Sequence, residues 1–467
     1  MNGPGPARQA PYDHAVSFRQ AAWTWARVAA LSFGGPAGQI AVMHRILVEE
    51  KRWIGETRFL HALNYCMLLP GPEAHELAIY IGWLLHRVRG GIVAGVLFVL
   101  PGLITLGILS WVYAAFGGIG IVQSLFFGLK AAVLAVVLEA VVRVGKRALK
   151  SPASVVIAGL AFIGIFFFAA PFPLIILAAA FVGFAGNRWR PDWFMAGGGQ
   201  GAAEGAGDTP ATIDTAFARE IPSHVRPSFL RVVKVLAIGG IVWLGPLVLL
   251  LALQGPANVF TSIAAFNSKM AVVTFGGAYA VLAYMAQQAV EKYHWLRPGE
   301  MLVGLGFAET TPGPLICVVQ FVGFMAAFRH PGALNPVFAG TLGGVLAMWS
   351  TFVPPFIWIF LGGPYIEALI GNKSLNAALS AITAAVVGVI LNLAIWFALH
   401  TLFAQMVAIR GYGFTVSLPV PGSVNWPALA LSAAAMIAIF RFKVGMIATL
   451  VGCSALGALY YLLVGVP

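Results

Sequence analysis

A 46-residue hydrophobic segment occurs twice in this chain. Residues 27–72 align without a gap on residues 269–314, at a constant offset of 242 positions, and 14 of the 46 aligned positions are identical. Both copies interrupt an apolar run with Gly and Pro at the same places. A duplicated apolar unit with such breaks is typical of secondary transporters, whose substrate site lies between the repeats. Functional residues are therefore expected where the two copies meet.

The composition places both copies in a membrane. Of the 467 residues, 60% are hydrophobic and 9% are charged. A water-soluble core of this composition would leave too few polar groups to cover its surface. The spans must be helices of about 20 residues, because lipid offers no hydrogen-bond partners to free backbone groups. The predicted fold class is therefore an all-α polytopic membrane protein.

Apolar runs divide the chain into two related halves. The first transporter repeat is expected at 21–186 and the second at 254–467. Residues 1–20 lack the apolar core of a signal peptide and are expected to form a cytoplasmic tail. Residues 187–229 are rich in Gly and Ala and are predicted to be a flexible cytoplasmic linker. One connecting transmembrane helix, 230–253, then moves the chain across the membrane, so inverted-topology repeats are expected.

Basic residues indicate the orientation. They cluster at 143–150 and 188–234, which should be cytoplasmic, whereas 112–118 contains no Lys or Arg and fits the outside. The N-terminus is then cytoplasmic and the C-terminus lies outside. The formal charge of +12 reports this orientation, and no nucleic-acid partner is expected. The number of crossings is left open: about 13 if 21–48 and 59–86 each cross, or 9 if the broken segments are re-entrant hairpins.

The breaks are candidate substrate-binding elements. Proline cannot continue a preceding helical turn but is well placed as the first residue of a new helix. Each break therefore predicts a helix end and a helix start within the membrane. Helix starts expose unpaired N–H groups and the positive end of the dipole, which suits an anion. The predicted substrate-binding residues at the four breaks are Ser32, Gly34, Gly35, Pro36, Pro70, Gly71, Pro72, Thr274, Gly276, Gly277, Pro312, Gly313 and Pro314.

Two cations occupy the same position in the two copies. Arg27 and Lys269 precede Gly34 and Gly276 by seven residues, or two helical turns, so they should lie on the same face as those breaks. A buried cation in lipid is costly and usually functional. The pair is therefore predicted to supply positive charge to a bound anion. The alternative is that each side chain extends to the membrane interface.

Other charged residues at membrane depth are not symmetric. Glu73, Glu76 and Glu309 are candidates for proton coupling, and the alternative is that these carboxylates form structural ion pairs with Lys130 or with Arg residues. The cysteines lack CxxC spacing and the histidines lack helical metal-ligand spacing, so no metal is predicted. No nucleotide-binding motif or nucleophile–base arrangement occurs, so neither a cofactor nor an enzymatic activity is expected.

These motifs also carry a family resemblance. Phe33-Gly34-Gly35-Pro36, Glu49-x-x-x-Trp53 and Pro70-Gly71-Pro72, with weaker copies in the second half, resemble the long two-domain form of the chromate transporter family of bacterial inner membranes. The resemblance implies chromate efflux, driven by the membrane potential or by proton antiport, with sulfate as a related substrate. The second copy has Ala278 in place of Pro36, so the halves are expected to do unequal jobs.

Three alternatives stay open from the sequence. A carrier for sulfate or another oxyanion, an importer included, would have the same features, because chromate and sulfate are both tetrahedral dianions. An anion channel would also use broken helices, and saturable flux would argue against it. The oligomeric state is open as well, a homodimer included.

Overall fold

The computed structural model describes residues 16–33, 35–189, 211–219, 222, 224–275, 278–365, 373–411 and 414–465. These residues are almost all helical, apart from the antiparallel hairpin of β1 (Met406–Gly411) and β2 (Phe414–Pro419). Seven helices in the described ranges are long and apolar enough to cross a membrane. The predicted all-α polytopic fold is confirmed.

The helices follow the two halves of the chain. The first half contains α1 (Phe18–Leu31), α2 (Gly35–His44), the π-helix η1 (Arg45–Glu50), α3 (Glu56–Cys66), α4 (Glu73–Phe116), α5 (Gly120–Ala148), α6 (Pro152–Phe168) and α7 (Phe172–Trp189). Between the halves lie α9 (Thr212–Arg219) and α10 (Phe229–Gln254). The second half contains α11 (Val259–Val273), α12 (Ala278–Gln287), the π-helix η2 (Gln288–Lys292), α13 (Glu300–Thr310), η3 (Leu315–Cys317), α14 (Val318–Arg329), α15 (Pro336–Gly362), η4 (Gly363–Tyr365), α17 (Lys373–Leu402), η5 (Pro421–Ser423), α18 (Trp426–Phe440) and α19 (Met446–Val464).

Local sequence explains several helix starts. Asn258, Asn335 and Asn425 each precede a helix, and each side-chain oxygen accepts hydrogen bonds from first-turn N–H groups. These bonds satisfy N–H groups that have no partner within the helix. Polar residues at these positions thus end the loops and begin apolar spans.

Helix α4 consists of two antiparallel arms. His86 and Arg87 have non-helical backbone angles, so residues 73–85 form a short arm and residues 88–116 a long arm. A methyl group at Gly82 would lie 2.5 Å from the carbonyl oxygen of Gly90, so the arms are in backbone contact. The long arm therefore runs back alongside the short arm, in the opposite direction.

The first break of each repeat lies at the tip of a hairpin. Arg27 and Glu50 flank the break at 32–35, and their side chains form an ion pair of 2.7 Å. On one straight helix, 23 residues would span about 35 Å. In the second repeat, the rings of Phe266 and Tyr284 flank the equivalent break and lie 5.7 Å apart. Both segments therefore fold back on themselves.

The second breaks behave in the same way. The rings of Tyr65 and Tyr80 lie 6.2 Å apart across the break at 67–72. Glu300, the first residue of α13, and Arg329, the last residue of α14, form an ion pair of 2.7 Å. These contacts support re-entrant hairpins, which was one of the two alternatives from the sequence. The candidate spans among the described residues are then the long arm of α4 together with α5, α7, α10, α15, α17 and α19, and α6 and α18 are shorter apolar helices.

The duplication is also visible in backbone detail. Each first hairpin ends in a π-helix, η1 or η2, followed by a residue with positive φ, Arg52 at 51° and His294 at 53°. The N–H of Trp53 donates to Leu47 and that of Trp295 to Ala289, both at 2.8 Å. Equivalent residues thus form equivalent bonds in the two repeats.

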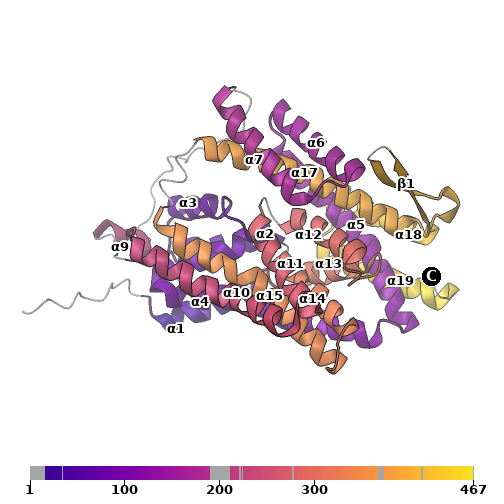
Figure 1. The fold of residues 1–467 in the computed structure, drawn as a ribbon, viewed down its shortest axis with the longest axis horizontal. Helices are drawn as coiled ribbons and strands as arrows, with labels where there is room; N and C mark the ends of the chain where they lie inside the picture. The colour runs from indigo at the N-terminus through magenta and orange to yellow at the C-terminus, as the bar shows by residue number, and fades with distance from the viewer. Residues whose placement is uncertain are drawn as a thin grey trace, which may run out of the picture.

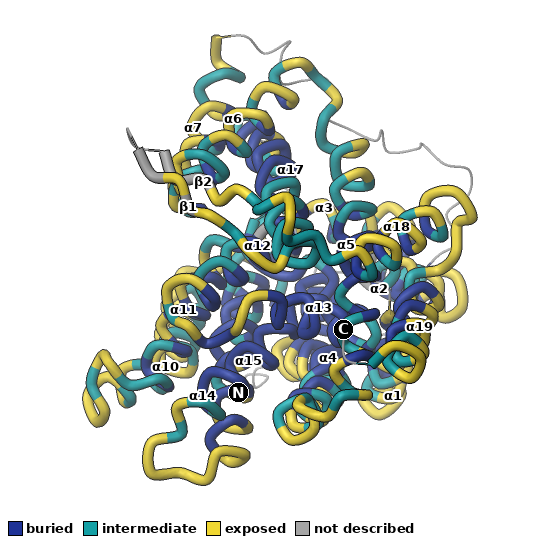
Figure 2. Tube along the Cα trace, turned by 90° about the vertical axis from the view of Figure 1, so that its right-hand side faces the viewer, coloured by how far each residue is buried: buried dark blue, intermediate teal, exposed yellow. Residues whose placement is uncertain are grey.

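The two ends of the molecule differ. In Figure 1, α9 lies at the left-hand end near α3 and α4, whereas β1 and the C-terminus lie at the right-hand end. Figure 2, seen from the right-hand end, shows the buried parts of α13, α15 and α5 surrounded by more exposed helices.

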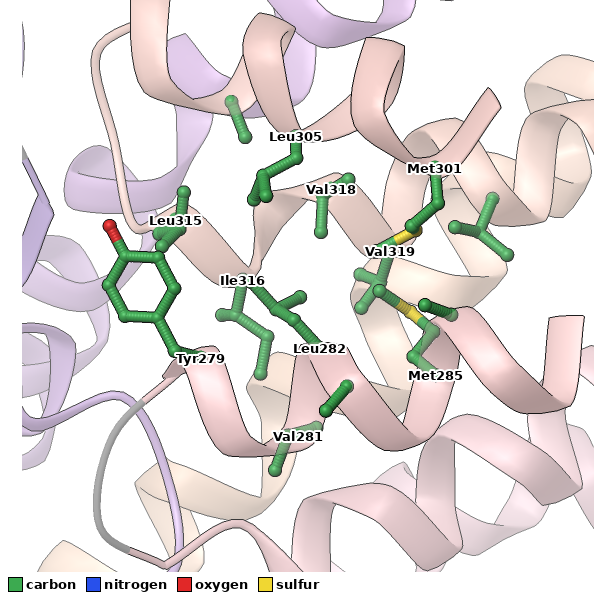
Figure 3. Packing of buried hydrophobic residues seen from close by; sticks show 14 of the residues in the cluster. Tyr279, Val281, Leu282, Met285, Met301, Leu305, Leu315, Ile316, Val318 and Val319 are labelled. Atoms are coloured by element: carbon green, nitrogen blue, oxygen red, sulfur yellow. The ribbon is translucent and has the colours of Figure 1, made fainter. Parts of the chain in front are cut away.

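Apolar side chains from the second repeat fill much of the centre. Figure 3 shows Val281, Leu282 and Met285 of α12 facing side chains from α13, η3 and α14. Leu282 and Met285 are fully buried. This packing holds α12, α13 and α14 around the second-repeat breaks.

The region between the repeats differs from the sequence-based expectation in its described part. Residues 187–229 were expected to be a flexible linker, but α9 lies within this range and binds the loop that joins η1 to α3. The N–H groups of Thr212 and Ile213 donate to the carbonyl oxygens of Arg52 and Trp53, at 3.0 and 2.9 Å. Ile213 is fully buried there. Its burial supplies a hydrophobic contribution that composition alone did not reveal.

Candidate functional site

The breaks of the two repeats are bonded to one another. The N–H of Gly71 donates to the carbonyl oxygen of Thr274 at 2.9 Å, and the N–H of Gly313 donates to that of Ser32, also at 2.9 Å. Gly71 and Gly313 are equivalent positions, as are Ser32 and Thr274. Each second break is therefore joined to the first break of the other repeat. The four breaks predicted from the sequence therefore form two bonded pairs, each with one break from each repeat.

One further bond strengthens only one of these two contacts. The side-chain amide of Gln39, in α2, donates to the carbonyl oxygen of Gly313 and is buried. The equivalent residue in the second repeat is Val281, which has no donor. The contact at Gly313 therefore has one more hydrogen bond than the contact at Gly71.

The hydroxyl groups at the breaks are bonded within their own helices. Ser32 Oγ donates to the carbonyl oxygen of Val28 at 2.7 Å, and Thr274 Oγ1 donates to that of Met270 at 2.6 Å. Both side chains are buried. In this conformation their hydroxyl hydrogens are not directed to a ligand, so the donors available at the breaks are backbone groups.

Those backbone donors come from helix starts. Helix α2 begins at Gly35, the short arm of α4 at Glu73, α12 at Ala278 and η3 at Leu315. The first N–H groups of a helix have no partner within it, and the dipole adds partial positive charge. Such starts border both bonded pairs of breaks, a setting that favours an anion.

The predicted glycines and prolines are placed as follows. Pro72 and Pro314 directly precede the short arm of α4 and η3, and Pro36 is the second residue of α2. Pro70 and Pro312 precede the two bonded glycines. Gly34, Gly276 and Gly277 lie outside the described residues.

Two carboxyl groups lie on the first turn of the short arm of α4, Glu76 fully buried and Glu73 partly buried. A methyl group at Gly71 would be 2.5 Å from Oε1 of Glu76, so this side chain lies against the break. Both carboxyl oxygens of Glu76, and Oε2 of Glu73, are buried without a hydrogen-bond partner among the described residues. An ionised carboxylate in such a position is costly and would repel an anion at the same break.

A third carboxyl group bridges the second-repeat breaks. Glu309, in the last turn of α13, accepts a hydrogen bond of 2.6 Å from the hydroxyl of Tyr279, in the first turn of α12. Both residues are buried, and Figure 3 shows the Tyr279 hydroxyl at the edge of the apolar cluster. The equivalent first-repeat residues are Met67 and Ala37, so this bond belongs to one repeat only.

The two predicted cations do not lie at the breaks in this structure. Arg27 is exposed and bonded to Glu50. Lys269 is exposed as well, and it forms no ion pair within the part of the chain that the structure describes. The position equivalent to Glu50 is Lys292, so the first repeat holds a neutralised pair where the second holds two cations.

Lys130 also lies apart from the predicted carboxyl partners. Its ammonium group would be 3.5 Å from a methyl group at Gly299, next to the start of α13. Glu73, Glu76 and Glu309 form no ion pair with any described residue. The predicted structural pairing of these carboxylates with Lys130 is therefore absent from this conformation.

A separate pocket lies at the end of the molecule where α11 begins. It has a volume of about 730 Å³ and is lined by Asn258, Lys292, Tyr293, His330 and neighbouring residues. None of the residues predicted to bind substrate lines it. Within the described ranges, no group of three or more His, Cys, Asp or Glu side chains could hold a metal ion.

Sequence reasoning missed two residues of this site. Gln39 and Tyr279 lie in apolar runs that immediately follow the first breaks. A polar group within one turn of a predicted helix start was the available signal. Their partners, Gly313 and Glu309, are 274 and 30 residues away along the chain, so the contacts themselves could not be read from local pattern.

Comparison with known proteins gives consistent matches. The sequence profile of a family described as chromate transporter matches residues 19–184 and 261–458. The chain is 31% identical over 365 residues to a chromate transport protein of Pseudomonas aeruginosa, covering 77% of this chain and 76% of that protein. It is 28% identical over 374 residues to a chromate transport protein of Cupriavidus metallidurans, covering 80% and 81%.

A more distant relative carries a less specific name. An uncharacterized transporter of Methanocaldococcus jannaschii is 24% identical over 372 residues, covering 79% of this chain and 81% of that protein. No solved structure gives a significant match.

Proposed function

Because this chain belongs to the chromate transporter family, we propose that it is a secondary carrier that exports chromate across a bacterial inner membrane. The observation that carries this proposal is the reciprocal pair of bonds from Gly71 to Thr274 and from Gly313 to Ser32. Each of these bonds joins a break of one repeat to a break of the other, so helix starts from both repeats border the bonded pairs. Inverted repeats with a site between them are the architecture expected for alternating access.

Chromate would bind at the four helix starts through backbone N–H groups. A tetrahedral dianion can accept several hydrogen bonds at once, and helix starts bind such anions without a basic side chain. A site without a direct cation binds moderately, which suits a carrier that must also release its substrate. Arg27 and Lys269, exposed and about two turns before the breaks, would act by long-range attraction instead of contact.

The membrane potential would drive export. Moving one charge across 100 mV changes the free energy by about 2.3 kcal/mol, so a dianion gains about twice that on leaving a negative-inside cell. No coupled reaction is then required. With the basic loops expected in the cytoplasm, export moves the anion away from that side, and the C-terminus would then lie in the periplasm.

Proton antiport is a second candidate, favoured by the Tyr279–Glu309 bond. This buried carboxyl group borders the breaks, and the tyrosine hydroxyl offers it a donor. Antiport requires that protonation of Glu309 and chromate binding exclude each other, so that the carrier returns with a proton after it has released the anion. Glu73 and Glu76 border the other second break and would take part in the same way.

The experiment is uptake of chromate into inside-out membrane vesicles with an imposed potential, positive inside the vesicle. We expect saturable accumulation that increases with the potential and falls when excess sulfate competes. Uptake that does not saturate would favour an anion channel. Absence of chromate uptake by folded protein would show that chromate is not its substrate. Sulfate uptake in the same vesicles would then identify the protein as a carrier of another oxyanion.

A further inference from the structure

The two loops that join the hairpins of each repeat have the same backbone but different partners. The first-repeat loop, residues 51–55, and the second-repeat loop, residues 293–297, each contain a buried tryptophan, Trp53 or Trp295. In both loops, the carbonyl oxygen of this tryptophan and an N–H two residues later form bonds to groups outside the loop. The groups that form these bonds come from the same hairpin in the second repeat but from α9 in the first.

The second-repeat loop is completed by its own hairpin. Glu300 accepts a hydrogen bond of 2.7 Å from the N–H of Arg297. Arg329, at the end of α14, donates to the carbonyl oxygen of Trp295 at 2.7 Å and to both oxygens of Glu300. One carboxylate and one guanidinium thus tie the loop to both ends of the second hairpin.

The first repeat lacks that carboxylate. The position equivalent to Glu300 is Arg58, and the position equivalent to Arg297 is Gly55. Here the carboxylate comes from Asp214 of α9, which accepts a bond of 2.7 Å from the N–H of Gly55 and pairs with Arg58. The carbonyl oxygen of Trp53 accepts from the N–H of Ile213 at 2.9 Å, where Trp295 accepts from Arg329.

We propose that α9 is a working part of the first repeat, in which Asp214 performs the positioning role that Glu300 performs in the second. Asp214 fixes the loop between the two first-repeat hairpins, and those hairpins carry the breaks at Ser32 and Gly71. Fixing the loop makes the hairpins move as one body. Asp214 is a positioning residue, because it is bonded to the loop and not to the breaks.

Other contacts show that this docking is specific. Ile213 is fully buried against the loop, and Ala211 is nearly so. The guanidinium group of Arg58 lies 4.3 Å from the centre of the Phe217 ring, while its Nε contacts Asp214. The side chain of Arg58 is therefore held on two sides by α9, which a passive tether would not require.

The docking of α9 stands on the contacts alone, whereas its effect on transport rests on the proposed function. Hydrogen exchange of the Gly55 N–H reports docking without any transport assay. If wild-type protein does not carry chromate, that measurement still decides whether Asp214 holds the loop.

The first experiment compares Asp214→Asn with Thr215→Ala in full-length protein. Thr215 bonds only to Ala211 and Thr212 within its own segment, so its replacement is the matched control on the same helix. We expect Asp214→Asn to increase exchange at Gly55 by at least about tenfold, corresponding to about 1.4 kcal/mol. The maximum chromate uptake rate should fall several-fold with little change in KM, and Thr215→Ala should match wild type. Unchanged exchange and rate in Asp214→Asn would overturn the inference.

The second experiment transfers the carboxylate. In Arg58→Glu/Asp214→Arg, the acid occupies the position that Glu300 has in the second repeat, with a guanidinium group to pair with it. We expect Arg58→Glu alone to be slow and the double variant to regain most of the uptake rate. A double variant as slow as the single variant, although it folds, would contradict an exchangeable positioning pair.

The third experiment fixes α9 covalently. Arg52→Cys/Thr212→Cys places two thiols where the backbones are already joined by a bond of 3.0 Å. Because α9 is proposed to move with the repeat, the oxidised protein should transport at the wild-type rate. Oxidation in the Asp214→Asn background should also restore its rate. Loss of transport on oxidation, reversed by a reductant, would mean that α9 must undock and would overturn the proposal.

Discussion

The N–H of Gly313 lies 2.9 Å from the carbonyl oxygen of Ser32, although 281 residues separate them in the sequence. The symmetric bond joins Gly71 to Thr274. Neither repeat can therefore form its site alone, because each first break is satisfied by the second break of the other copy. A change of access would have to break or slide one or both of these bonds, and the additional Gln39 bond makes the two contacts energetically unequal.

Gly313→Ala should severely reduce transport. Gly313 has φ of 122°, and an added methyl group would lie 3.3 Å from the Cα of Gly102. A side chain at positive φ costs about 1–2 kcal/mol, and backbone atoms of α4 cannot easily give way. Gly332→Ala is the control, because Gly332 has φ of 61° with open space around it. We expect chromate uptake to fall at least tenfold, by about 1.4 kcal/mol or more, only in Gly313→Ala. Equal rates in the two variants would remove close packing at this break from the mechanism.

Glu309→Gln should test proton coupling. Glutamine cannot ionise. If ionisation of Glu309 accompanies transport, chromate uptake by the variant will therefore lose its pH dependence, measured from about pH 5.5 to about pH 8. A pH profile in Glu309→Gln identical to that of wild type would assign the residue a structural role.

Tyr279→Phe should reduce the free energy of unfolding by about 1–3 kcal/mol, because it leaves a buried oxygen of Glu309 without its partner. Tyr284→Phe is the matched control on α12.

Lys269→Gln should raise the apparent KM for chromate more than Arg27→Gln does. Lys269 shares its hairpin with Lys292, whereas Arg27 is bonded to Glu50. An exposed ion pair of this kind contributes at most about 1 kcal/mol to stability, so both variants should fold. The Lys269 effect should shrink at high ionic strength, because salt screens long-range attraction. Wild-type KM in both variants at low salt would show that neither cation acts on the substrate.

The segment that precedes α10 should loosen in acid. Burial, with Arg87 and Arg231 nearby, lowers the pKa of His224 from 6.5 to about 4. The neutral ring is therefore favoured when the segment is folded, and its contribution to stability is present above pH 6.5 and decreases as the pH falls toward 4. Hydrogen exchange of residues 224–232 should rise over this range, and His224→Phe should abolish the rise while preserving the contact with Trp83. An acid-induced rise that persists in His224→Phe would assign the effect to another group.

The membrane class, the duplication and the positions of the breaks can all be read from the amino-acid sequence. These features are local or repetitive, because hydropathy over a span and Gly or Pro at a break act on the backbone within a few residues. Starts of helices at Gly35, Glu73, Ala278 and Leu315 follow directly from that chemistry. The predicted all-α architecture needed no long-range information.

The pairing of the breaks and the positions of the charged side chains depend on long-range contacts in the folded protein. An Arg in an apolar run is equally compatible with a contact to substrate and with an exposed ion pair. In this conformation Arg27 forms an ion pair with Glu50. Composition indicated flexibility for residues 187–229, yet Ile213 and Asp214 of α9 find partners some 160 residues earlier. Such contacts depend on which surfaces the folded repeats bring together, and the free energy of those contacts has no counterpart in local sequence pattern.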